Sequence, residues 1–158
     1  MAVRMELYRI LIRELNDYQI IELREVAPVT GDADIDSPSK PGQQQYSQLE
    51  GGRAFPIVIG LPEAQAIERR LKGIPIKRPQ THDLLMNIVT ALGGKLESIT
   101  INDLTDQTFF AILSVRDKAG HLLEIDSRPS DAIALGIASD VPIYVAEHVL
   151  DAVQKDDD

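Results

Sequence analysis

The stretch that decides the fold is Glu124-Ile125-Asp126-Ser127-Arg128-Pro129-Ser130-Asp131-Ala132-Ile133-Ala134-Leu135. It has the pattern of a strand that ends in a polar turn and continues directly into a helix. Pro129 suits the first turn of that helix, because its fixed φ is already helical and its missing N–H needs no partner there. Asp131 follows in the same turn, where the positive end of the helix dipole favours a carboxylate. We therefore expect any site chemistry to gather around this turn.

An earlier stretch, Lys77-Arg78-Pro79-Gln80-Thr81-His82-Asp83-Leu84, repeats this pattern ahead of an apolar helical run. Two helix N-termini, each preceded by an arginine, are two potential anion sites, because free backbone N–H groups and the helix dipole attract a phosphate or carboxylate. The alternative is that each arginine pairs with a nearby aspartate and only fixes its own turn. The sequence leaves both interpretations open.

These two stretches also carry a family resemblance. Residues 78–85 and 126–135 resemble the bifunctional nuclease domain family of bacteria and plants. The resemblance extends through residues 55–60 with Glu63-Ala64, through 109–111 and to 142–145, so it covers nearly the whole chain in order. It implies a nuclease that hydrolyses the phosphodiester bonds of DNA and RNA.

Composition predicts one globular domain. The chain has 158 residues, of which 44% are hydrophobic, enough for a real core. The absence of cysteine excludes disulfides and thiolate metal sites and fits a reducing compartment. No apolar run approaches the roughly 20 residues of a membrane helix, and Glu6 interrupts the N-terminus where a signal peptide continues its apolar segment. We expect a cytoplasmic protein without a membrane partner.

The net charge of −9 at pH 7 is unusual for a nucleic-acid-binding protein, since such proteins usually present a basic face to the phosphates. The local exception is a basic patch of five residues: Arg69, Arg70, Lys72, Lys77 and Arg78. This patch either faces phosphate or is the solvated C-terminal end of a helix, where cations oppose the dipole. The chain also lacks an extended basic groove and an obvious helix for reading base edges, so little sequence preference is expected.

Residue patterning predicts an α+β domain over residues 1–155, with antiparallel or mixed sheets and about four helices, and an acidic tail at 156–158. A hairpin is expected over residues 5–26 with its turn at Asn16-Asp17, and the remaining strands at 54–60, 96–104, 108–115, 122–125 and 142–145. Helices are expected at 62–72, 81–92, 129–139 and 146–154. Residues 28–52, rich in Gly, Pro, Asp, Ser and Gln, are predicted to be a mobile insertion loop.

Three patterns predict which side chains enter the core. In the first helix, Ala64, Ile67 and Leu71 share one face. The core stripe of the second helix is expected to be Leu84, Leu85, Ile88, Val89 and Leu92. Between 96 and 101, strict alternation would place Leu96 on the side opposite Ile99 and Ile101.

Catalytic candidates come from what phosphodiester cleavage needs. A metal nuclease gathers carboxylates or histidine around Mg²⁺ or Mn²⁺, and the candidates here are Asp126, Asp131, His82 and Asp83, with Glu124 in reserve. Asp126 and Asp131 are the first candidates for metal ligands, although no recognised ligand spacing is present. Phosphate contacts are expected from Arg78, Arg128, Ser130 and Lys77. For His82, the alternative to acid–base chemistry is a place in a helix cap.

Two functional hypotheses remain. The first is the DNA- and RNA-cleaving nuclease that the resemblance implies. The second is a non-catalytic ligand- or protein-binding regulatory module, which the acidic charge and the missing metal motif favour. For either function a homodimer is expected, because the strand-rich N-terminal half has sheet edges that need covering and because the resemblance implies it.

Overall fold

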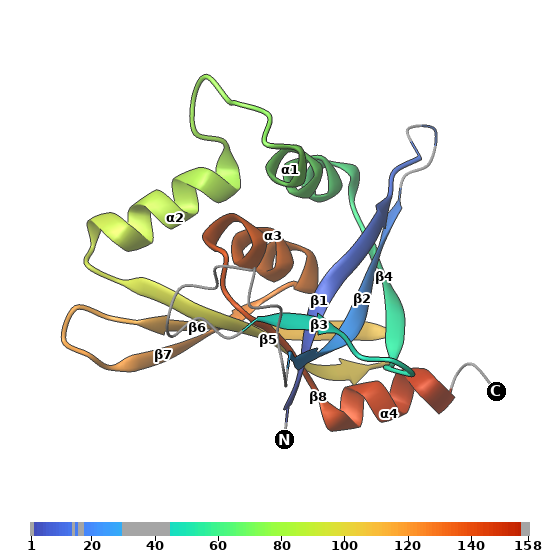
Figure 1. Ribbon diagram of the computed structural model, residues 1–158. Coiled ribbons are helices and arrows are strands. Elements are labelled where there is room, and N and C mark those ends of the chain that lie inside the picture. The colour runs from blue at the N-terminus through green and yellow to red at the C-terminus, as the bar shows by residue number, and fades with distance from the viewer. Residues whose placement is uncertain (1, 14, 16–17, 30–44, 156–158) are drawn as a thin grey trace, which may run out of the picture.

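In the part of the chain that the structure describes, eight strands form one sheet and four helices pack on it (Figure 1). The computed structural model describes residues 2–13, 15, 18–29 and 45–155. In chain order the elements are β1 (Ala2–Leu11), β2 (Gln19–Pro28), β3 (Tyr46–Gln48), β4 (Ala54–Ile59), α1 (Leu61–Lys72), α2 (Thr81–Ala91), β5 (Lys95–Thr105), β6 (Thr108–Arg116), β7 (Leu122–Ser127), α3 (Pro129–Ser139), β8 (Ile143–Ala146) and α4 (Glu147–Lys155). The α+β class predicted from the sequence is confirmed.

The strand order is β3-β2-β1-β8-β5-β6-β7, and β4 also pairs with β2. β8 pairs in parallel with β5, whereas the other pairs are antiparallel. The predicted pairing of the N-terminal hairpin is confirmed as β1 with β2, and its predicted turn at residues 16 and 17 lies outside the described residues. β8 therefore joins the β1–β2 half of the sheet to the β5–β7 half.

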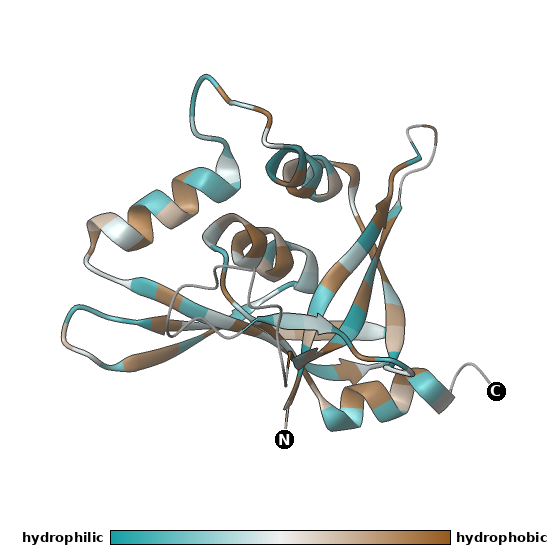
Figure 2. Ribbon diagram, in the orientation of Figure 1, coloured by the Kyte–Doolittle hydropathy of each residue, from teal (hydrophilic) through white to brown (hydrophobic). Residues whose placement is uncertain are grey.

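Helices α1, α2 and α3 lie together on one face of the sheet, and α4 lies apart from them, beneath the strands in the view of Figure 1. The core runs from the sheet into α3, whose residues 132–136 are all buried. At Gly136 the helix lies close to β5, since a Cβ there would stand 3.4 Å from the Cγ1 of Ile99, which is van der Waals contact. Figure 2 shows how strongly apolar α3 is. None of the helices in the described part of the chain is long and apolar enough to cross a membrane.

A three-residue ion cluster holds α4 against the sheet. Arg53, just before β4, donates to Glu25 of β2 at 3.1 Å and to Glu147 at the start of α4 at 2.9 Å. These hydrogen bonds hold the pKa of each of the two glutamates below its usual value. The cluster therefore ties together elements that are far apart in the sequence.

The predicted core stripe of α2 was wrong. Leu84, Leu85, Ile88 and Leu92 are 52%, 43%, 47% and 75% exposed, and only Val89 of the predicted set packs against the core. The helix rests on α3 and β5 through a neighbouring face that includes His82 and Met86, so the apolar stripe lies beside the contact rather than in it. In α1, Ala64 and Ile67 are buried as predicted, but Leu71 is 54% exposed.

Two further expectations need correction. Strict alternation along β5 fails because its register against β6 shifts between Leu96 and Ser98. Such a bulge reverses the facing of the following residues, so Leu96, Ile99 and Ile101 are all buried. Within the predicted loop 28–52, residues Tyr46–Gln48 instead form β3, which pairs with β2. The prediction of mobility for residues 30–44 falls outside the described residues.

Candidate functional site

The first turns of α1, α2 and α3 meet beside the turn that follows β7. Each turn contributes one ionisable side chain: Glu63 from α1, His82 from α2 and Asp131 from α3. A fourth residue, Arg128, is the N-cap of α3 and links two of them. Proline lies in the first turn of both α1 and α3, where its fixed φ favours helix initiation and holds the neighbouring acid in place.

The contacts within this group are short and specific. Nε2 of His82 lies 3.0 Å from Oδ1 of Asp131. Arg128 donates through Nε to Oδ2 of Asp131 at 2.9 Å and through Nη2 to Oε1 of Glu63 at 3.1 Å. Both oxygens of Asp131 are thus engaged, one by the imidazole and the other by the guanidinium. We call these four residues the Arg128 cluster.

Burial within the cluster is uneven. The side chains of Glu63, His82 and Asp131 are 13%, 17% and 30% exposed, whereas that of Arg128 is 67% exposed. Partial burial alone would raise the pKa of Asp131, but the hydrogen bonds from Arg128 and His82 outweigh it and hold the pKa below its usual value. Asp131 is therefore a carboxylate at neutral pH, fixed on both sides.

The contact with Asp131 orients the imidazole of His82. A carboxylate can only accept hydrogen bonds, so Nε2 of His82 must carry the proton that it shares with Asp131. In the neutral ring this leaves Nδ1 as the basic nitrogen, and Nδ1 has no hydrogen-bond partner among the described residues. A histidine held by an aspartate in this way is the arrangement that hydrolases use to orient a general base.

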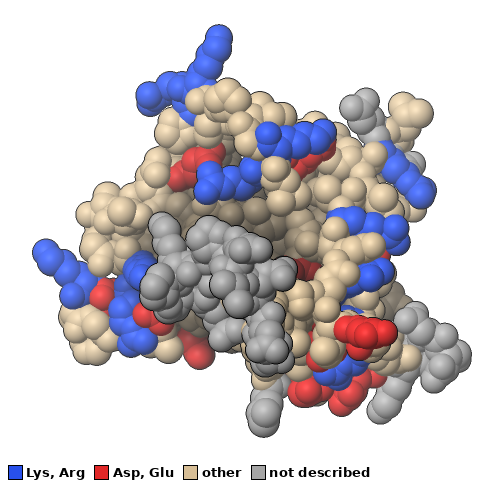
Figure 3. All heavy atoms as spheres, viewed as in Figure 1, with Lys and Arg blue, Asp and Glu red and all other residues tan. Residues whose placement is uncertain are grey.

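His82 also lines a small recess between α1, α2 and α3, with a volume of about 90 Å³. The other ionisable side chains of the recess are Arg69 and Arg70 at the end of α1 and Asp83 at the start of α2. Figure 3 shows lysine and arginine side chains over the upper part of this face, where α1 and the α1–α2 link lie in Figure 1. The recess thus brings part of the predicted basic patch next to His82.

The structure brings together His82, Asp131 and Arg128, three of the residues selected from the sequence, and buries Ser130 beside them. Asp83 instead accepts a hydrogen bond from the backbone N–H of Gln80 at 3.1 Å and caps α2. Lys77 and Arg78 lie exposed in the α1–α2 link.

Asp126 lies away from the cluster. On β6 and β7, Asp126 pairs with Ile112, and the next pair is Ala111 with Ser127. Ala111 is buried, so the Ala111–Ser127 pair is on the covered face of the sheet. Successive strand residues alternate between faces, so Asp126 and Glu124 share the face of the sheet that points away from α3. Nothing in their positions joins them to Asp131.

Glu63 was not among the site residues predicted from the sequence. It follows Gly60 and Pro62 in the first turn of α1, as Asp131 follows Pro129 in the first turn of α3. This shared pattern of a proline and then an acid at a helix start was the signal that could have indicated Glu63. Its contact with Arg128, 65 positions along the chain, could not be read from spacing.

A divalent metal does not fit the cluster in its present arrangement. Among the described residues, no three histidine, aspartate or glutamate side chains gather closely enough to hold an ion. The Arg128 guanidinium lies between the carboxylates of Asp131 and Glu63, where a cation would have to replace it.

Comparison with known proteins identifies the family. The bifunctional nuclease domain model matches residues 47–158. Uncharacterized proteins from two strains of Mycobacterium tuberculosis are each 37% identical to this chain over 116 residues, which is 73% of this chain and 68% of theirs. Bifunctional nuclease 1 of Arabidopsis thaliana is 23% identical over 100 residues, covering 62% of this chain and 31% of the plant protein. The chain belongs to the bifunctional nuclease domain family.

Proposed function

We propose that this protein is a phosphodiesterase that cleaves DNA and RNA with little sequence preference. Family membership and the distant similarity to a plant bifunctional nuclease support the reaction class. The observation that carries the assignment to a site is the contact between His82 and Asp131 beside the arginine-lined recess. This pairing supplies an oriented base and a place for phosphate within one group of residues.

In the proposed reaction, Nδ1 of His82 takes a proton from the attacking water as the water oxygen bonds to phosphorus. The bond from phosphorus to the leaving oxygen breaks, and the protonated imidazole can return the proton to that oxygen. Asp131 keeps the ring in its tautomer and stabilises the imidazolium. Because water rather than a ribose hydroxyl attacks, the same steps serve DNA and RNA.

Phosphate binding is assigned to Arg69 and Arg70, which share the recess with His82. Guanidinium groups suit this role because their planar set of donors matches two phosphate oxygens at once. Arg128 is better placed to position Asp131, since two of its three nitrogens already donate to carboxylates. Dependence on Mg²⁺ or Mn²⁺ stays a prediction from the sequence, and no step here uses a metal.

One observation favours the alternative, a non-catalytic binding module. The Arg128 cluster pairs one arginine with two carboxylates, so it resembles a structural ion network as much as a phosphate site. In that case the cluster would only fix the three helix starts, and no hydrolysis would be measured.

The test is hydrolysis of labelled single-stranded DNA and RNA by the purified protein and by His82→Asn and Asp131→Asn. His82→Asn removes the base and Asp131→Asn removes the carboxylate that orients it, so we expect each to lose at least about 100-fold in rate. His121→Asn is the matched control, because His121 is 76% exposed and pairs with Asp117, four positions before it and away from the Arg128 cluster. Wild-type rates in folded His82→Asn protein would overturn the assignment, and parallel reactions with a chelator measure the dependence on metal.

A further inference from the structure

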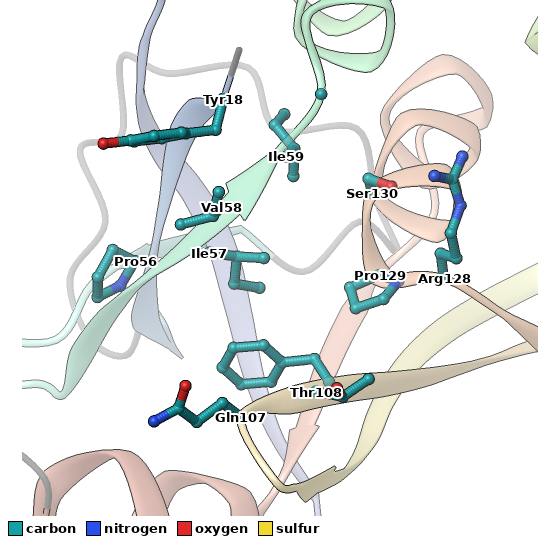
Figure 4. A pocket seen from close by; sticks show the side chains of 12 residues that line it. Tyr18, Pro56, Ile57, Val58, Ile59, Gln107, Thr108, Arg128, Pro129 and Ser130 are labelled. Atoms are coloured by element: carbon teal, nitrogen blue, oxygen red, sulfur yellow. The ribbon is translucent and has the colours of Figure 1, made fainter. Parts of the chain in front are cut away.

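A cavity of about 490 Å³ opens on the other side of the first turn of α3, and its lining includes Arg128 but not His82 (Figure 4). Three elements form its walls: the outer edge of β4, the tip of the β5–β6 hairpin and the start of α3. The volume falls within the roughly 300–1,000 Å³ of small-molecule sites. The reaction proposed above makes no use of this cavity.

The β4 wall offers free backbone groups. Among the described strands, β4 pairs only with β2. Pro56 has no N–H to donate, and within a sheet proline occupies positions whose N–H side faces away from the neighbouring strand. Two residues further on, Val58 has the same facing, so its N–H and carbonyl also point away from β2. Val58 is 62% exposed and lines the cavity.

The hairpin wall places an amide at the rim. Asp106 and Gln107 have φ values of 51° and 64°, as expected for a two-residue turn that matches the twist of the strands. Gln107 and Thr108 lie at the lower rim in Figure 4, opposite the start of α3. The ring of Phe109, next in the strand, adds an apolar and aromatic surface to the lining.

The α3 wall holds an unpaired hydroxyl on a largely buried residue. Ser130 is 7% exposed and lines the cavity, and its Oγ has no hydrogen-bond partner among the described residues. This hydroxyl is therefore free to form a hydrogen bond with a polar group in the cavity. Beside it, the third nitrogen of Arg128, Nη1, also has no partner in the described part of the chain.

We propose that this cavity binds one nucleobase of the strand that is cleaved. A base has two apolar faces for the walls around Phe109 and a polar edge for Gln107, Ser130 and the β4 backbone. Arg128 at the end of the cavity would then meet the phosphate attached to that nucleoside. Arg128 contacts Asp131 at 2.9 Å, and Asp131 contacts His82 at 3.0 Å. The next phosphodiester of the bound strand would therefore lie toward His82, the proposed general base.

This inference rests on the proposed function and adds a substrate class to it. A base can enter the cavity only after it leaves its stack, which costs least in single-stranded nucleic acid. The protein therefore selects unpaired strands or strand ends over intact duplex. Since every base offers an aromatic face, the cavity favours single strands without selecting a sequence.

The experiment measures binding, not hydrolysis, and uses the full chain. Calorimetric titrations compare adenosine 5′-monophosphate with ribose 5-phosphate, and we expect the nucleotide to bind at least ten-fold more tightly because of its base. Val58→Trp fills the cavity and should abolish this difference. Gln48→Trp is the matched control, since Gln48 is exposed on β3, which pairs with the same edge of β2 but does not line the cavity. Equal affinity for the two compounds, or an unchanged difference in folded Val58→Trp protein, would overturn the proposal.

A second variant and a second substrate keep the two proposals separable. Ser130→Ala removes only one oxygen and should weaken nucleotide binding several-fold without unfolding the protein. Methyl 4-nitrophenyl phosphate has no nucleobase, so its hydrolysis by the wild-type protein reports on the His82 site alone. Hydrolysis without any preference for the nucleotide would refute the base site alone. Nucleotide binding without hydrolysis of any substrate would refute the proposed function and leave the base site in place.

Discussion

Arg128 shows how one residue can organise contacts that the local sequence does not reveal. Its guanidinium reaches Asp131 three positions away and Glu63 sixty-five positions away. The first contact could be predicted from the Arg-Pro-Ser-Asp pattern, because both residues lie in one turn. The second could not, since it depends on how α1 packs against α3. The same holds for His82, whose contact with Asp131 spans 49 positions.

Replacing Arg128 by alanine is expected to destabilise the protein modestly. The change leaves Asp131 and Glu63 without a cationic partner, but solvent screens the pair because Arg128 is 67% exposed. We expect a loss of about 1 kcal/mol in the free energy of unfolding, near the upper end for exposed pairs. Urea unfolding measures it. Arg116→Ala, which breaks the exposed pair with Glu97, should cost less, and equal losses would contradict a special role for Arg128.

Asp131 should also make stability depend on pH. Its pKa is lower in the folded protein than the value of about 3.9 in an unfolded chain. The resulting stabilisation is complete above that unfolded value and is lost as pH falls through the lowered pKa. Urea unfolding of wild type and Asp131→Asn between pH 7 and pH 3 should therefore show their stabilities converging on acidification. A constant difference across this range would mean that Asp131 does not titrate as described.

At the scale of elements, the sequence predicted the order and type of most strands and helices, because buried strands and glycine-terminated helices have local signatures. It did not predict the facing of α2. A periodic pattern shows that Leu84, Leu85, Ile88 and Leu92 share one side, but not whether that side meets the core or the solvent. The bulge after Leu96 and the short strand β3 were missed for a related reason, since both are defined by pairing with another strand.

Helix α3 is the element most tightly constrained by packing, and Gly136 tests this. A Cβ at this position would make ordinary contact with Ile99 at 3.4 Å, and alanine favours a helix over glycine by about 1 kcal/mol. Gly136→Ala should therefore leave the thermal midpoint unchanged or raise it slightly. Gly136→Leu should lower it strongly, because the longer side chain cannot fit between α3 and β5. Similar midpoints for the two variants would show that the contact is loose.

At the scale of the whole molecule, the exposed apolar stripe of α2 is expected to be part of a homodimer interface. Leu123 and Ile125 of β7 lie on the same face of the sheet as α2 and α3, since they pair with the buried Val115 and Leu113. With the four exposed residues of α2 they form an exposed apolar surface, and a standard interface buries about 800 Å² on each partner. Glu124 and Asp126 disfavour edge-to-edge pairing of two β7 strands, so two copies would meet through these faces.

Light scattering at tens of micromolar should give the mass of a dimer. Leu92→Glu introduces a charge at the most exposed position of the stripe and should yield monomers. Leu71→Glu is the matched control, because Leu71 is also exposed, at 54%, but lies on α1. A monomeric wild type, or a Leu92→Glu variant that still dimerises, would contradict this interface.

The position of β8 between β1 and β5 has a consequence for synthesis on the ribosome. The N-terminal strands can pair with one another as they emerge, and so can β5, β6 and β7. Neither group can join the other in the sheet before residues Ile143–Ala146 have left the exit tunnel, because among the described strands β8 is the one that pairs with both. Until then the nascent chain exposes the unpaired edges of β1 and β5 that later pair with β8. Chaperones would bind, and neighbouring nascent chains would pair wrongly, at this stage of translation.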